Sequence, residues 1–125
     1  QSERSVAMWE RLGDAQKDHD LLIVPAQFGL RHRGRSVRRA REVFTTNEFG
    51  LGVFAIGIML LTHPERLQHY ENLWIDCAGD EYSCDAGGRF GRAPYFDFGV
   101  DGVGFYADWS GVAGADCGSV SAFQQ

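Results

Sequence analysis

The hydrophobic pattern of this chain changes period near residue 74, and that change constrains the fold more than any other feature. Before it, apolar residues recur at helical spacing, as Val6, Trp9 and Leu12 do. After it, alternating residues and turn signals are typical of strands. The order predicts an α+β fold in which N-terminal helices pack on a small C-terminal antiparallel β-sheet. The chain has 125 residues with no repeat or linker, so we expect one globular domain over residues 1–125.

Four helices are expected, over residues 3–19, 36–44, 46–61 and 62–72. Ser2, or Ser5 as a later choice, is the N-cap expected for the first helix, and Ser36 is the one expected for the second. Thr45 and Glu48 have capping-box spacing ahead of a long apolar run, which predicts a central helix that is apolar nearly all round and therefore buried. The glycines in that helix cost helix propensity, and close approach of another helix or a sister subunit would compensate for them.

Four segments are expected as strands or hairpins. A short run at 21–24 ends at Pro25, which cannot donate to a ladder. Residues 73–77 form a second strand. Residues 95–98 and 103–109 form a hairpin around Asp101 and Gly102, because Asp-Gly supplies the positive φ of tight turns. Residues 119–123 add a last strand.

The basic residues are unevenly distributed. The net charge is −5, yet residues 31–70 carry seven basic and three acidic groups (+4), while residues 71–125 carry two and nine (−7). Guanidinium groups bind phosphate and carboxylate oxygens well. We therefore predict a soluble binding module with an arginine-rich surface for an anionic ligand or an acidic protein partner. Its residues would be Arg31, Arg33, Arg35, Arg38, Arg39 and Arg41.

Two other interpretations of the arginine cluster stay open. Nucleic-acid binding is less favoured, because the whole chain is acidic. Pairing of the arginines with the acidic C-terminal part, within the fold or across a dimer, would leave no free cationic surface.

An enzyme is the alternative function. Its active site would lie at an acidic loop and an aromatic hairpin, and it would need Asp76, Asp80 or Glu81 to converge with a histidine or a metal. The loop lacks the ligand spacing of an EF-hand, so we expect no metal, and no nucleotide or other cofactor signature is present. The acidic loop comprises Asp76, Asp80, Glu81 and Asp85, and the hairpin aromatics are Tyr95, Phe96, Phe98, Phe105, Tyr106 and Trp109.

Association and location follow from composition. On the hairpin, alternation places aromatic residues on both faces, and one face needs a cover; together with the glycine-bearing apolar helix this predicts a homodimer. The three cysteines form no disulfide framework, and no segment resembles a signal peptide or is long enough to span a bilayer. We therefore expect a cytoplasmic protein with no membrane association.

Three sequence blocks resemble an uncharacterised small bacterial protein of the kind encoded on mobile elements such as integron gene cassettes. They are Asn47–Phe54, Leu61–Leu67 and Leu73–Glu81. The resemblance covers residues 45–85 and implies no activity and no functional residues.

Overall fold

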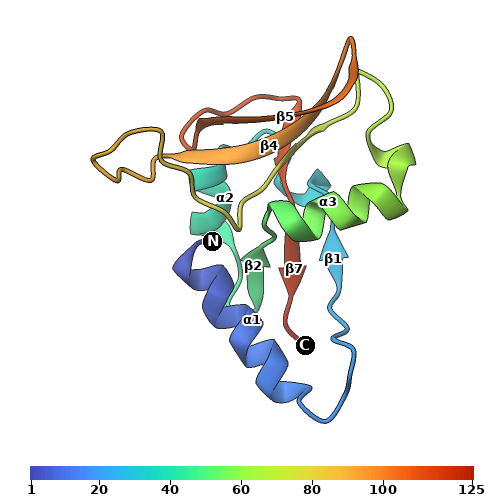
Figure 1. Ribbon diagram of the computed structural model, residues 1–125, viewed down its shortest axis with the longest axis vertical. Coiled ribbons are helices and arrows are strands. Elements are labelled where there is room, and N and C mark those ends of the chain that lie inside the picture. The colour runs from blue at the N-terminus through green and yellow to red at the C-terminus, as the bar shows by residue number, and fades with distance from the viewer.

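The computed structural model describes all of residues 1–125 and confirms the α+β class (Figure 1). The helices are α1 (Glu3–Ala15), α2 (Val37–Val43) and α3 (Val53–Thr62), and two 3₁₀ helices cover Leu30–His32 and Pro64–Arg66. The strands are β1 (Ala26–Gln27), β2 (Glu48–Gly50), β3 (Trp74–Asp76), β4 (Arg92–Gly99), β5 (Gly102–Trp109), β6 (Cys117–Ser119) and β7 (Ser121–Phe123).

The strands form two sheets, so the prediction of one small C-terminal antiparallel sheet is wrong in detail. One sheet has the order β1-β7-β2 and is antiparallel. The other has the order β5-β4-β3-β6 and is mixed, because β3 and β6 run parallel. The single strand expected over 119–123 is divided at the buried Val120, and this one segment joins both sheets.

The first two helices form where their caps predict them. The Ser2 side chain accepts a hydrogen bond from the Ser5 N–H at 3.4 Å, and Ser36 accepts one from the Arg39 N–H at 3.2 Å. The first helix is shorter than expected and ends at Ala15. The strand expected at 21–24 is absent: this segment is loop, held by the Gln16 side chain, which bonds both backbone groups of Ile23.

The central helix begins later than predicted, because the Thr45–Glu48 spacing does not start a helix. The Glu48 carboxylate does accept the Thr45 N–H, at 3.4 Å, but the segment that follows is the buried strand β2. α3 begins after Gly52 and buries only Ile56 completely. The expectation of a fully buried helix is therefore wrong.

The predicted helix over 62–72 is also wrong. Only the single 3₁₀ turn Pro64–Arg66 forms. The chain then turns, and hydrogen bonds from two side chains hold this turn in place. Asn72 accepts the backbone N–H groups of Gln68 and His69, and the Arg66 guanidinium donates to the carbonyls of Phe28 and Leu73. These contacts bind the turn to the rest of the fold.

The strands around residue 74 and the hairpin are confirmed. β3 lies within the predicted range, and β4 and β5 pair from Arg92 opposite Trp109 to Gly99 opposite Gly102. Gly102 adopts φ 108°, the left-handed conformation that the Asp-Gly turn predicts.

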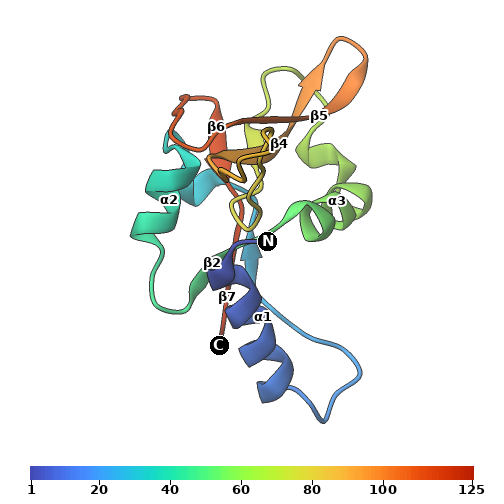
Figure 2. The ribbon, with the colours of Figure 1, turned by 60° about the vertical axis from the view of Figure 1, so that its left-hand side comes forward.

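The main core lies between α1, α3 and the two sheets. Phe49, Ile56, Ile75 and Val120 are fully buried there, and Trp9 packs edge-on against Phe49. Figure 2 shows α2 and α3 on opposite sides of the molecule, flanking the strands. None of the helices combines the length and the apolar character that crossing a bilayer requires.

A buried polar network fixes the three-stranded sheet to the loop before α2. Glu48 is fully buried, and its Oε1 lies 2.7 Å from His32 Nε2 and accepts a hydrogen bond from Ser121 at 2.7 Å. Arg31 approaches the same oxygen at 3.3 Å from the surface. Burial alone would raise the pKa of Glu48, but the hydrogen bonds from His32 and Ser121 outweigh it and hold the pKa below its ordinary value.

Removal of the Glu48 carboxylate should destabilise the fold strongly. Glu48→Ala removes the carboxylate that binds the His32 Nε2 atom and the Ser121 hydroxyl, and we expect a loss of about 3–5 kcal/mol in urea unfolding. Because the folded pKa of Glu48 is lowered, its contribution is present above its ordinary pKa and is lost as the pH falls through the folded value. The matched control is Glu42→Ala, at a half-exposed i,i+3 pair with Arg39, where the loss should stay under about 1 kcal/mol. Equal losses for the two variants would contradict this role for Glu48.

Candidate functional site

The arginines before α2 already bind groups of this chain. Arg31 pairs with Glu48 and lies over the Phe123 ring at 5.5 Å. The Arg33 guanidinium donates to the Ala115 carbonyl at 2.9 Å. Arg35 donates to the Arg31 carbonyl at 3.0 Å. These three guanidinium groups therefore anchor a loop that contacts β6 and β7.

The arginines of α2 divide between structural and free positions. Arg39 pairs with Glu42 on the same helix at 2.9 Å. Arg41 donates to the carbonyls of Ala78 and Asp80, at 2.9 and 2.7 Å, and its burial lowers its pKa. Arg38 is the exception among the six, because its guanidinium makes no hydrogen bond or ion pair and lies beside Gly111.

The carboxylates of the acidic loop do not converge on one site either. Asp80 accepts the Val53 N–H at 2.6 Å and so caps α3. Glu81 approaches Arg41 at 3.5 Å, and Asp85 approaches Arg89 at 3.8 Å. No group of three or more His, Cys, Asp or Glu side chains has the arrangement of a metal site. Asp76 lines a cavity on the four-stranded sheet, whereas Glu81 lines a separate pocket beside α1.

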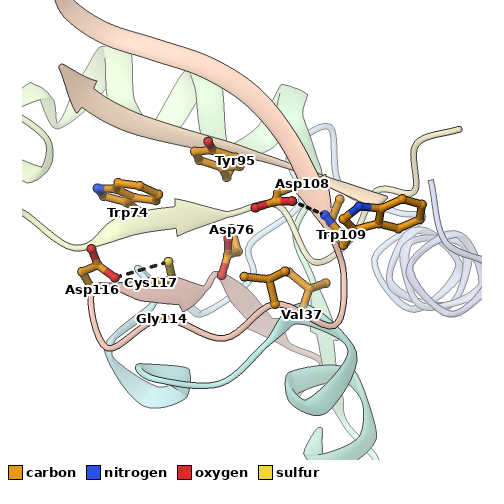
Figure 3. A pocket seen from close by; sticks show the side chains of 11 residues that line it. Val37, Trp74, Asp76, Tyr95, Asp108, Trp109, Gly114, Asp116 and Cys117 are labelled. Atoms are coloured by element: carbon orange, nitrogen blue, oxygen red, sulfur yellow. Dashed lines mark hydrogen bonds between the residues drawn. The ribbon is translucent and has the colours of Figure 1, made fainter. Parts of the chain in front are cut away.

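That cavity, which we call the aspartate pocket, is the best candidate site. It has a volume of about 230 Å³ and lies on the face of the four-stranded sheet turned toward α2 and the loop between β5 and β6. Figure 3 shows three aspartates arranged around this space. Its lining residues are Val37, Trp74, Asp76, Ala93, Tyr95, Asp108, Trp109, Val112, Gly114, Asp116 and Cys117.

The register of the sheet explains why these side chains meet. Trp74 and Asp76 are two positions apart on β3 and therefore share a face. Asp76 lies opposite Tyr95 of β4, and Trp74 lies opposite Cys117 of β6. Asp108 lies opposite Ala93, two positions before Tyr95 on the same face. Four strands thus bring polar groups from distant parts of the chain to one surface.

Asp76 has the most unusual environment in the pocket. Its carboxyl is largely buried and accepts no hydrogen bond from the chain. Burial, with the neighbouring charges of Asp108 and Asp116, raises the pKa of Asp76 to about 7. A carboxyl that is partly buried, borders a cavity and meets no donor of its own chain is a candidate for ligand binding.

The other two carboxylates of the pocket differ from Asp76. Asp108 accepts the Trp109 backbone N–H at 2.6 Å. Asp116 accepts only a long contact from the Cys117 thiol, at 3.8 Å. Burial and the charges of Asp76 and Asp116 raise the pKa of that thiol to about 12. Cys117 is therefore a protonated thiol, not an activated nucleophile.

Aromatic rings form the remaining wall. Trp74 and Tyr95 stack with their centroids 5.4 Å apart and their planes at 4°. Trp109 borders the pocket from the end of β5, where Arg92 lies over its ring at 4.8 Å. No Lys, Arg or His lines the pocket. The pocket therefore combines negative charge with aromatic surface and holds no counter-charge of its own.

Only parts of this site can be predicted from the sequence. The pattern places Asp76 in the acidic loop and Tyr95 and Trp109 on the hairpin of the alternative active site. It does not connect these residues with Trp74 or Asp108. The available signal was the alternation Trp74-Ile75-Asp76 and Tyr106-Ala107-Asp108, which places an aromatic residue and an aspartate on one face of each strand.

Comparison of the chain with protein-family models, with curated proteins and with solved structures finds no match in any of the three.

Proposed function

We propose that the protein binds a small organic cation, of the class of substituted ammonium ions, in the aspartate pocket. The observation that carries this proposal is the Asp76 carboxyl, which is largely buried, faces a cavity and receives no hydrogen bond from the chain. A buried carboxylate is costly unless a cation or hydrogen-bond donors compensate it. An ammonium ion in the pocket would supply that compensation.

The rest of the pocket lining supports a cation in preference to an anion or a neutral molecule. Asp108 and Asp116 add two more carboxylates, and no basic side chain lines the pocket. Ring faces of Trp and Tyr attract cations, and the attraction grows when the site excludes water. The Trp74–Tyr95 stack places such a surface beside Asp76.

The size of the pocket limits the ligand. Its volume of about 230 Å³ is below the roughly 300–1,000 Å³ typical of sites for drug-sized molecules. The ligand that fits is therefore a compact ammonium compound, not a polymer or a nucleotide.

The arginine surface and cytoplasmic location stay predictions. Five of the six arginines donate to groups of this chain. Binding of an anion, an acidic protein or nucleic acid there would have to compete with those internal contacts. The unpartnered Asp76 therefore supports binding of a cation more strongly than the cluster supports binding of an anion.

Catalysis is the second candidate function, and one observation favours it. A carboxyl whose pKa lies near 7 can both donate and accept a proton at neutral pH, as a general acid or base must. The enzyme hypothesis expects Asp76, Asp80 or Glu81 to converge with a histidine or a metal, and no histidine lines the aspartate pocket. Mass spectrometry of each bound cation after prolonged incubation tests for turnover.

A matched pair of ligands tests the proposed function. Choline carries a quaternary ammonium group, and the neutral alcohol in which carbon replaces its nitrogen has nearly the same shape. We expect choline-type cations to quench or shift the fluorescence of Trp74 and Trp109 with saturation, and to bind at least about tenfold more tightly than the neutral compound. Equal affinities, or no saturable change with any ammonium compound of this size, would refute the proposal.

A further inference from the structure

The outer face of α3 is apolar and uncovered. The helix, Val53–Thr62, contains no charged residue. Phe54 and Leu61 are 79% and 82% exposed, and Ile58 between them is about half exposed. Figure 2 shows α3 along one side of the molecule with no other helix or strand outside it. These three side chains follow the i, i+4, i+7 spacing by which one helix presents a stripe to another.

A groove continues the apolar surface from α3 onto the hairpin. Val53, Gly57 and Leu60 line it from the helix, and Phe96 and Val103 line it from β4 and β5. Its volume is about 650 Å³. Phe105, which pairs with Phe96 on the same side of the sheet, is also about half exposed. The surface therefore offers both projecting side chains and a hollow.

Gly57 has no explanation within the monomer. It lies inside the helix, where glycine is unfavourable. A Cβ built on it would meet no atom within 4 Å, so no neighbour in this chain requires a residue without a side chain. Glycine on a helix face lets another backbone or a large side chain approach closely.

The exposed area is sufficient for a modest dimer. Phe54, Ile58, Leu61, Val103 and Phe105 together expose on the order of 600 Å² at the fractions observed, so a two-fold pair would bury roughly 1,200 Å², the lower bound of specific interfaces. This face has side chains that project beside the hollow at Gly57. It can therefore pair with the same face of a second copy about a two-fold axis.

We infer that this face is the interface of a homodimer in which the α3 helices of two copies pack across a two-fold axis, with Leu61 or Phe54 of each copy seated beside Gly57 of the other. A second copy is the occupant that fits, because both surfaces are then uncharged and no charge is buried without a partner. The aspartate pocket lies on the opposite face of the four-stranded sheet and stays open in such a dimer.

The test is sedimentation equilibrium of the whole chain over a concentration series up to about 100 μM, with three variants. Leu61→Glu places a charge in the interface. Gly57→Gln fills the hollow, and because it replaces a helix-interior glycine with a better helix former it should raise the thermal midpoint of the monomer. Leu21→Glu is the matched control, since Leu21 has nearly the same exposure, 78%, in the loop after α1.

We expect the unmodified chain to sediment at twice its monomer mass. Leu61→Glu and Gly57→Gln should each raise the dimer dissociation constant at least tenfold, while Leu21→Glu leaves it unchanged. Circular dichroism melts establish that all three variants are folded. A monomer throughout the concentration series overturns the inference, and a different protein would then be the partner that covers this face. A dimer that both interface variants leave intact overturns it as well.

Discussion

Asp76→Asn should abolish the binding of organic cations while leaving the fold intact. Asparagine has nearly the same shape but no charge, so the ammonium ion loses its buried counter-ion. Truncation of one partner of a buried charge pair costs about 2–5 kcal/mol or more, which corresponds to at least about a 30-fold loss of affinity. Isothermal titration calorimetry with a choline-type ligand at pH 8 measures this loss directly. The control is Asp101→Asn, at the exposed hairpin turn, which should bind as the unmodified chain does.

The same substitution should make the free protein more stable at pH 8. The folded pKa of Asp76, about 7, is above its ordinary value of 3.8. Between these values the folded state binds more protons than the unfolded state, so stability falls as the pH rises from about 4 to 7 and stays low above that. The asparagine side chain in Asp76→Asn carries no charge to bury, and we expect a gain of roughly 1–3 kcal/mol in urea unfolding at pH 8. Such an exchange of stability for function is typical of binding sites.

Loss of stability together with loss of binding would contradict this account, because it would identify Asp76 as a structural residue. Unchanged cation affinity in Asp76→Asn would contradict it more directly.

Cation binding should depend steeply on pH. The ammonium ion requires the charged form of Asp76, and the proton on Asp76 must leave before the cation binds. Below pH 7 we therefore expect the affinity to approach a tenfold fall for each pH unit, or about 50-fold from pH 7 to pH 5. Above pH 8 the affinity should be constant. The aspartate pocket is also lined by Asp108, Asp116, Tyr95 and Cys117. The pKa values of Tyr95 and Cys117 are raised, so both groups stay neutral between pH 5 and pH 8.

A quaternary ammonium ligand is the appropriate probe for this dependence, since it does not titrate itself. Calorimetry in buffers of different ionisation enthalpy should show release of nearly one proton per cation bound at pH 6. In Asp76→Asn no proton should be released. An affinity that stays constant from pH 5 to pH 8 in the unmodified chain would exclude Asp76 as the counter-ion.

The parts of the fold that depend on local signals could be predicted from the sequence. Ser2 and Ser36 cap helices because a serine cap needs only the next few backbone N–H groups. The Asp101-Gly102 turn depends only on the left-handed preference of glycine. These features need no knowledge of the rest of the chain.

The errors arise where a tertiary contact overrides a local pattern. Glu48 has the spacing of a capping box, but His32 and Ser121, which are 16 and 73 residues away, bind its carboxylate and hold it on a strand. A tertiary contact also overrides the local pattern at Gly50. The backbone there packs so closely against the backbone of Ala78 that a Cβ on residue 50 would collide with it. Neither partner can be inferred from the residues around Glu48 or Gly50.

The candidate site was predicted only in part for a related reason. The acidic-loop pattern predicts Asp76 and the hairpin pattern predicts Tyr95 as site residues. That they lie opposite each other depends on the register between β3 and β4, two strands separated by 15 residues of loop. The arginine cluster is conspicuous in the sequence because its members are neighbours. The aspartate pocket is not, because its carboxylates lie at positions 76, 108 and 116.

The most direct test of the central claim is a ¹³C NMR titration of the Asp76 side-chain carboxyl, with and without a saturating quaternary ammonium ion. We expect a pKa of about 7 in the free protein and a pKa at least about two units lower when the cation is bound. An ordinary pKa in the free protein, or a pKa that the cation does not change, would contradict the claim that Asp76 is held ready for a cationic ligand.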